Sequence, residues 1–299
     1  MHVHAPGCGC KGLHANASLR RDPTRTIYIR AKYEADLVRR FTRLKRQIIT
    51  AVGTENGFGL QANQDAVAPP RFNFPRSADK VDAFMTWLED QEYAGILETT
   101  RGTPLRSAAQ RSWQNVYINS AYQKGIAQAA GLMRGDGVDV SDRWIDAGFL
   151  RPIHADAVGL IHTRAYNELQ GITDVMDQQI SRTLALGLAE GRGPMDIARK
   201  MVDRVDAIGI TRARMLARTE TIAAHADSTL NTYDEAGLEG VSVMSEFSTA
   251  GDDQVCPECA ALEGREYSID EARGLIPLHP NCRCAWLPIV RNPRGIVLH

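Results

Sequence analysis

The chain has 299 residues, which is enough for one large or two modest domains at roughly 150 residues per domain. Hydrophobic residues make up 43% and charged residues 24%, values that exclude the disordered, collagenous and multi-span membrane classes. The formal net charge of -1 also excludes a general polyanion binder, so any nucleic-acid role needs a local basic patch.

The N-terminal segment, residues 1–22, is polar and has no hydrophobic period, so we expect a flexible arm there. It lacks the apolar stretch of a secretion signal, and no run of 18 apolar residues occurs in the chain. We therefore expect no membrane partner and reduced thiols inside a cell.

An N-terminal helical domain is predicted for residues 23–150, with Asp22-Pro23-Thr24 as the turn before its first helix. Apolar residues then follow at steps of four, four, three and four, which confines them to about an 80° arc of a helix. These residues are Tyr33, Leu37, Phe41, Leu44 and Ile48.

A basic ridge is predicted on the opposite side of the same helix, formed by Lys32, Arg39, Arg43 and Arg46. Residues 20–46 contain ten lysines and arginines against three acidic residues, so their net charge is +7 in a chain of net charge -1. The ridge is a candidate surface for a protein partner or for DNA, and a solvated helix face is the alternative.

Residues 53–76 show no regular period and are interpreted as a long connection. Helical patterns resume at 78–97 and after Thr103-Pro104, where we expect Thr103 to cap and Pro104 to take the first helical position. The stretch 131–142 is expected to interrupt this pattern.

A C-terminal domain is predicted for residues 151–299. Its helices are expected near 155–169, 173–190, 194–206 and 211–236, separated by Gly171, Gly191 to Gly193 and Gly209 and closed by Gly237. Residues 241–247 alternate like a strand, with 286–290 as the expected partner. The predicted fold class is mainly α with a small C-terminal α+β module, at about 241–290, held by zinc.

The six cysteines fall into two clusters, Cys8 with Cys10 and a C-terminal group of four. Disulfide scaffolds are short and spread their cysteines, whereas CxxC and CxC spacing in a long chain is typical of metal ligation. The candidate ligands are Cys256, Cys259, His279, Cys282 and Cys284.

A tetrahedral zinc ion needs four of these five groups. The CxxC pair supplies two, and either Cys282 with Cys284 or His279 with one of them completes the set. Buried free cysteines, or a disulfide formed on oxidation, are the alternative interpretation. Because four protein ligands are available, we expect a closed structural site that stabilises a small module.

A catalytic zinc ion is disfavoured by the surrounding sequence. The zinc deaminase signature needs H-x-E before P-C-x-x-C, but this chain has His154-Ala-Asp156 and His225-Ala-Asp227, with Val255 before Cys256. We expect the isolated His154, His162 and His225 to be satisfied helix residues.

The N-terminal arm offers a second candidate metal site. Its ligands would be His2, His4, Cys8, Cys10 and His14, and an arm that stays disordered until bound is the alternative.

Four segments occur in a characteristic order: Arg218-Thr219-Glu220, then STAGDD at 248–253, VCPECAALEG at 255–264 and PLHPNCRC at 277–284. Over about residues 172–290 they resemble the phage Mu F-like head morphogenesis family, also called minor head or minor capsid proteins. DPTRT at 22–26 and KVDAFMTWLEDQ at 80–91 resemble the N-terminal part of siphophage members. Phe247 stands where relatives often have tryptophan.

The resemblance implies a non-enzymatic protein present in few copies at the portal vertex, acting in procapsid assembly and in the fate of DNA at ejection. The implied partners are the portal protein, the major capsid or scaffolding protein, and packaged DNA. The implied location is the virion, and the host cytoplasm during assembly.

Two other functions stay open. One is a zinc-containing nucleic-acid-binding protein that contacts packaged DNA. The other is a zinc hydrolase or nuclease, which requires an open zinc position beside an acid or base.

Four further residues are predicted to support the zinc module. Arg218 and Glu220 are two apart, so they lie on different helix faces and reach different partners. Asp252 and Asp253 precede the CxxC pair in a Gly-Asp-Asp turn, where they can bind loop amides or steady a ligating histidine. A catalytic carboxylate is the alternative for these two.

Overall fold

A computed structural model describes residues 22–61, 69–141, 145, 151–238 and 242–291. It contains two compact units. The helical unit comprises residues 30–117 and 159–220, and the sheet unit comprises 1–29, 118–158 and 221–299. The predicted arm at 1–22 lies outside the described residues except for Asp22, and the division into domains near residue 150 stays a prediction.

The helical unit contains long helices, three of which continue directly into π-helical segments. Asp22 accepts a hydrogen bond of 2.8 Å from the amide of Ile27, where the first helix starts, as the turn sequence predicted. The elements are α2 (Ile27–Ile48), η1 (Ile49–Thr54), α3 (Ser77–Glu92), η2 (Tyr93–Leu97), α4 (Leu105–Gln110), α5 (Asn115–Gly135), α7 (Pro152–Ala189), α8 (Pro194–Arg204), η3 (Val205–Ile210) and α9 (Thr211–Leu238), of which α2, α5, α7 and α9 also have residues in the sheet unit.

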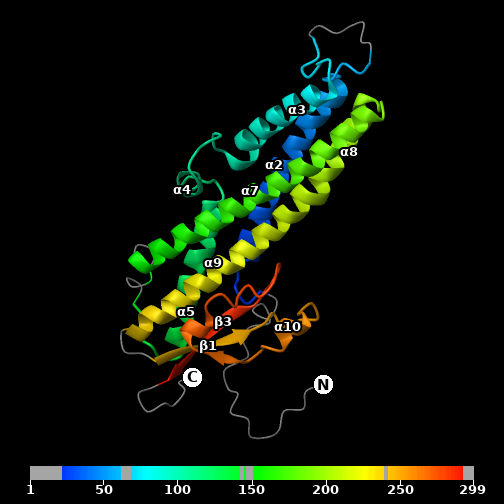
Figure 1. The fold of residues 1–299 in the computed structure, drawn as a ribbon. Helices are drawn as coiled ribbons and strands as arrows, with labels where there is room; N and C mark the ends of the chain where they lie inside the picture. The colour runs from blue at the N-terminus through cyan, green and yellow to red at the C-terminus, as the bar shows by residue number, and fades with distance from the viewer. Residues whose placement is uncertain (1–21, 62–68, 142–144, 146–150, 239–241, 292–299) are drawn as a thin grey trace. The chain divides into compact units, whose positions relative to one another are not determined.

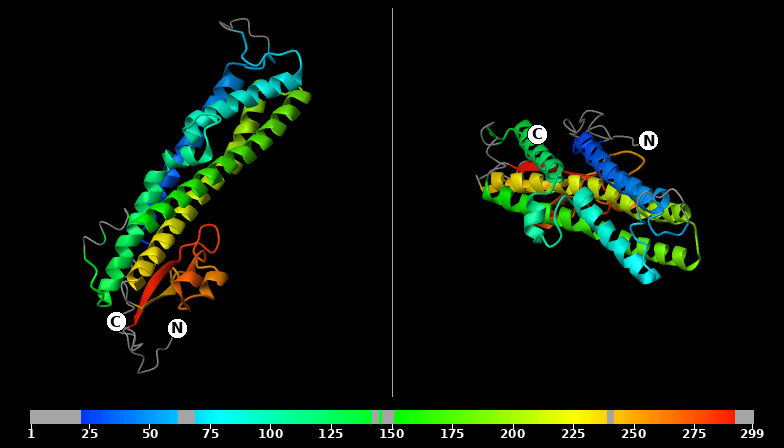
Figure 2. Two further views of the ribbon diagram at one scale, coloured as in Figure 1. Left: turned by 60° about the vertical axis from the view of Figure 1, so that its left-hand side comes forward. Right: turned by 90° about the horizontal axis from the view of Figure 1, so that it is seen from above.

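The predicted apolar stripe of α2 is confirmed, since all five of its residues are buried. They share a core with residues of α7 and α8, including Met176, Ile180 and Ile197. Figures 1 and 2 show α2 running alongside α3, and α8 packs against η1 and η3. This packing of amphipathic helices leaves the charged faces of α2 and α3 outside the core.

Three glycines do not end helices as predicted. Gly171 lies inside α7, which is a single helix of 38 residues, Gly209 lies inside η3, which continues directly into α9, and Gly237 lies inside α9. The predicted interruption at 131–142 begins after α5 ends at Gly135. A glycine within a helix costs only about 1 kcal/mol relative to alanine, so burial of neighbours such as Leu169 and Ile172 outweighs it. Pro104 is the N-cap of α4 and not its first residue, so this helix begins one residue later than predicted.

Gly209 serves close packing within the helical unit. A Cβ atom at this position would lie 2.6 Å from a ring carbon of Phe41 in α2. In contrast, Gly191 has a φ of 65° just after α7 and ends that helix, as predicted.

The sheet unit contains three antiparallel strands in the order β2-β1-β3. They are β1 (Ser242–Ser248), β2 (Glu266–Tyr267) and β3 (Ala285–Arg291). The predicted pairing of the first and last segments is confirmed, since β1 and β3 lie side by side (Figure 1). In this pairing Phe247 lies opposite Trp286. The two-residue β2 is too short to give a period in the sequence.

The core of the sheet unit surrounds Trp286. This indole contacts the ring of Phe247 edge-on at 5.5 Å and that of Tyr267 at 5.8 Å. The same buried cluster contains Tyr233 of α9 and the cysteines at 259, 282 and 284. The predicted class, mainly α with a small C-terminal sheet, is therefore confirmed.

Among the described helices, none combines the length and apolar character that crossing a membrane requires.

Candidate metal centre

The first half of the centre is a turn of chain at the start of α10 (Pro257–Ala260). Cys256 is the N-cap residue, and its sulfur accepts a hydrogen bond of 3.3 Å from the amide of Cys259. Pro257 suits the first helical position because it lacks the amide hydrogen that a helix start leaves unpaired. The proline after Cys256 and the cap bond thus hold the two cysteines in one turn.

The second half is another tight turn, in which the amide of Cys282 donates to the carbonyl of His279 at 3.1 Å. Asn281 has a φ of 64°, a conformation that asparagine tolerates better than most residues. The Nδ1 atom of His279 lies 2.8 Å from the carbonyl oxygen of Pro280, so Nδ1 carries the proton and donates. The lone pair of Nε2 is consequently free to bind a cation.

All five predicted ligands come together, in two overlapping groups that share Cys259. One group is Cys256, Cys259 and His279, and the other is Cys259, Cys282 and Cys284. Within each group the donor atoms lie within 4.8 Å of one another. His279 Nε2 is 3.1 Å from the sulfur of Cys256 and 3.2 Å from that of Cys259, which is 4.0 Å from the sulfur of Cys282.

The donor set and its spacing fit a zinc ion. Tetrahedral zinc with bonds of about 2.3 Å to sulfur places two sulfur ligands roughly 3.8 Å apart. Three sulfurs, those of Cys259, Cys282 and Cys284, are buried, and all four described cysteines are free thiols. The choice of four ligands among the five stays open, as does the alternative of buried thiols without metal.

The thiol pKa values follow from burial and crowding. Burial raises the pKa of Cys259 to about 12. A hydrogen bond with the side chain of Cys284 lowers the pKa of Cys282 to about 5. The same hydrogen bond between Cys282 and Cys284, together with burial, raises the pKa of Cys284.

Arg283, between the last two cysteines, is a supporting residue that the sequence reasoning missed. Its guanidinium group donates two hydrogen bonds, of 2.7 and 2.6 Å, to the two carboxylate oxygens of Asp252. The predicted role of Asp252 in steadying the loop stays a prediction, and this contact supports it. The available signal was a basic residue inside CxC with an acidic pair shortly before CxxC.

Asp253 is exposed, and its charge adds to that of Asp252 in raising the pKa of Arg283, for which the hydrogen bonds to Asp252 are the main cause. The loop is also bound from the other side, since the amide of Thr249 donates to Glu263 at 2.6 Å. Two side-chain contacts therefore fix the segment that precedes Cys256.

Arg218 and Glu220 contact different partners, as their spacing predicted. Arg218 pairs with Glu34 at 3.2 Å, and the buried Glu220 pairs with Arg164 at 3.0 Å. Both ion pairs lie in the helical unit, whereas the cysteines belong to the sheet unit. These two ion pairs support the packing of the helices. Neither of them connects Arg218 or Glu220 to the module that contains the cysteines, which is the connection that the sequence predicted.

The basic ridge is exposed along α2, as predicted for Lys32, Arg39, Arg43 and Arg46. Arg39 pairs with Asp36 one turn earlier.

His154 is buried between the hydroxyl of Tyr122, at 2.9 Å, and Glu235, at 3.1 Å. It is thus a satisfied helix residue, whereas the arm site at His2, His4, Cys8, Cys10 and His14 lies outside the described residues.

Part of the chain matches a known protein family. Residues 178–287 match the family described as phage Mu protein F like protein. The match includes Arg218 and Glu220, the Gly-Asp-Asp turn and all five candidate ligands. No curated protein and no solved structure matches the chain. Residues 178–287 are therefore similar to the phage Mu protein F like family, which is a family of phage head morphogenesis proteins.

Proposed function

We propose that this chain is a non-enzymatic minor head protein that binds the portal vertex, acts in procapsid assembly and influences DNA ejection. The observation that carries the proposal is the family match at 178–287, which includes the whole cysteine and histidine cluster. The portal protein is the proposed direct partner, with the major capsid or scaffolding protein as a further neighbour in the head. The location that follows is the virion.

The proposed role of the cluster is structural, with one zinc ion. Five donor groups surround the site, so four can bind zinc without leaving a position for water. The sheet that it would stabilise has strands of seven, two and seven residues. Sheets this small bury too little apolar area to fold readily alone, and a bound metal supplies the missing stability.

The proposed docking surface is the basic ridge of α2. Its exposed cations suit an acidic surface on the portal protein, since complementary charge speeds association and selects the partner. Lys32 and Arg39 lie toward the N-terminal half of this ridge.

A pull-down tests the portal contact. The full chain and tagged portal protein of the same phage are co-expressed, and the retained fraction is measured at low and at physiological salt. We expect Lys32→Glu with Arg39→Glu to lower retention at least about fivefold at physiological salt. Arg199→Glu with Arg212→Glu, a matched reversal at two exposed arginines of the same unit, is expected to retain wild-type binding.

Two outcomes contradict the proposal. The wild-type chain would fail to bind the portal protein at either salt concentration, or a labelled chain would be spread over the procapsid shell and not confined to one vertex.

DNA binding is the second candidate, favoured by the density of cations on α2. If it operates, duplex DNA binding weakens steeply as salt rises, because each neutralised phosphate releases a counterion. A salt-independent signal, or no binding at low salt, would remove this candidate.

A further inference from the structure

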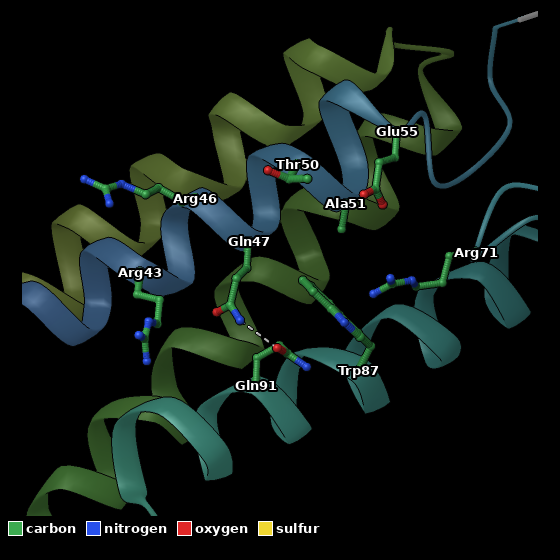
Figure 3. Close-up of a pocket in the computed structure, with 9 residues that line it drawn as sticks. All are labelled: Arg43, Arg46, Gln47, Thr50, Ala51, Glu55, Arg71, Trp87 and Gln91. Atoms are coloured by element: carbon green, nitrogen blue, oxygen red, sulfur yellow. Dashed lines mark hydrogen bonds between the residues drawn. The ribbon is translucent and has the colours of Figure 1, made fainter. Parts of the chain in front are cut away.

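A groove in the helical unit lies between α2 with η1 on one side and α3 on the other (Figure 3). It has a volume of about 380 Å³, within the size range of sites for small ligands. Its lining combines three guanidinium groups, an indole, two amides and one carboxylate. The residues are Arg43, Arg46, Gln47, Thr50, Ala51, Glu55, Arg71, Trp87 and Gln91.

The arginines of the groove differ from their neighbours on α2. Arg39 pairs with Asp36, Arg40 pairs with Glu98 at 2.6 Å, and Lys45 pairs with Asp206 at 2.6 Å. In the parts of the chain that the structure describes, Arg43, Arg46 and Arg71 have no ion pair or hydrogen bond. The groove thus contains three arginines without an acidic partner, beside the single carboxylate of Glu55.

The indole of Trp87 supplies an aromatic surface inside the groove. It is half-buried and lines the groove together with the small side chain of Ala51 (Figure 3). The guanidinium group of Arg71 lies 5.8 Å from the centre of this indole. It is therefore close enough to contact a base that stacks on the indole. Bases of nucleotides stack on such indoles, and the stack tolerates any base because each has a π face.

The amides of Gln47 and Gln91 supply a hydrogen-bonding edge. They bond to each other at 2.7 Å (Figure 3). One amide oxygen and several amide hydrogens stay free after this bond, whichever way the amides are assigned. A donor beside an acceptor matches the edge of a nucleobase.

We propose that this groove binds a nucleoside phosphate, either a free nucleotide or one nucleotide of a single-stranded nucleic acid. The base lies on Trp87 near the two glutamines, and the phosphate groups lie against Arg43 and Arg46. An acidic peptide fits less well, because it would not use the indole of Trp87. The inference does not depend on portal binding.

The test is a direct binding titration of the full chain. Fluorescence anisotropy with a labelled 12-nucleotide single strand, and calorimetry with a nucleoside triphosphate, measure the two sources of the same chemistry. Inorganic phosphate and a glutamate-rich peptide are the comparison ligands. We expect the strand, the nucleotide or both to bind at least about tenfold more tightly than either comparison ligand.

Variants locate the site. Arg43→Gln with Arg46→Gln is expected to weaken binding about tenfold or more and to reduce its salt dependence. Arg199→Gln with Arg212→Gln, at two exposed arginines of the same unit outside both the groove and the basic ridge, is the matched control and is expected to change affinity less than about twofold. Trp87→Leu is expected to weaken binding at least about fivefold, and Trp87→Phe to restore part of it.

Circular dichroism checks that each variant is folded, and Trp87→Phe keeps the test valid if Trp87→Leu is not. Three results would overturn the inference. They are no binding of strand or nucleotide at low salt, equal or tighter binding of the acidic peptide, and an effect of Arg199→Gln with Arg212→Gln as large as that of the groove variants.

Discussion

Arg283 and Asp252 form a bidentate ion pair that joins the CxC segment to the turn before the CxxC segment. Both side chains are about one quarter exposed, so solvent screens the pair only in part. The pair connects the two loops that carry the candidate ligands. Its main effect is expected on the position of the cysteines rather than on the stability of the whole chain.

Asp252→Asn is predicted to weaken metal binding. Residues that orient ligands typically contribute about 10- to 100-fold to metal affinity, so we expect a loss near the lower end of that range. Competition with a coloured zinc chelator measures the affinity. Asp253→Asn makes the same chemical change at the exposed neighbour and is expected to alter affinity less than about threefold. Equal losses in both variants would show that the ion pair has no particular role.

A buried pair of carboxyl groups predicts the pH dependence of the helical unit. Glu92 is buried and shares a hydrogen bond with Asp177. Burial is the main cause that raises both pKa values, that of Asp177 to about 7. In the unfolded chain both carboxyl groups lose their protons near pH 4. Folding therefore takes up protons, and stability falls as pH rises from about 4 to about 7.

Glu92→Gln is predicted to flatten this dependence, because glutamine donates to Asp177 without a charge. We expect the variant to gain about 1 kcal/mol or more at pH 7 relative to wild type and little at pH 4. Urea unfolding followed by circular dichroism at both pH values measures the difference. The exposed control Asp203→Asn on α8 is expected to leave the pH dependence unchanged. A wild-type stability that rises from pH 4 to pH 7 would contradict the prediction.

Replacing glycine by alanine is predicted to have opposite effects on stability at two positions of the helical unit. Gly209→Ala places a methyl group against the ring of Phe41 and is expected to destabilise by about 1–3 kcal/mol. Gly171→Ala adds a methyl group where nothing lies within 4 Å, so it is expected to stabilise by about 0.5–1 kcal/mol. Thermal and urea unfolding measure both, and a stabilising Gly209→Ala would refute the close packing.

The helices and the ligand cluster could be predicted because their signals are local. The stripe from Tyr33 to Ile48 gives a helical period, and CxxC with HPxCxC gives ligand spacing. The errors at Gly171 and Gly237 arose because burial of distant partners outweighs the small cost of glycine within a helix. Packing decided these cases, and single-sequence patterns do not record packing.

Contacts between distant segments were the other gap. The pair of Asp252 with Arg283 spans 31 residues of sequence, and the groove joins Arg43 to Trp87 across a long connection. Neither has a fixed spacing that would mark it. Glu92 was also missed, because an acidic residue near the end of an amphipathic helix is usually exposed.

The zinc content of the purified full chain tests the central structural claim most directly. Mass spectrometry of the metal is performed on wild type, Cys259→Ser and Cys8→Ser with Cys10→Ser. We predict one zinc ion per chain in wild type and in the N-terminal double variant, and none in Cys259→Ser because that residue belongs to both ligand groups. A folded wild-type chain without zinc, or zinc lost only from the N-terminal variant, would contradict the account.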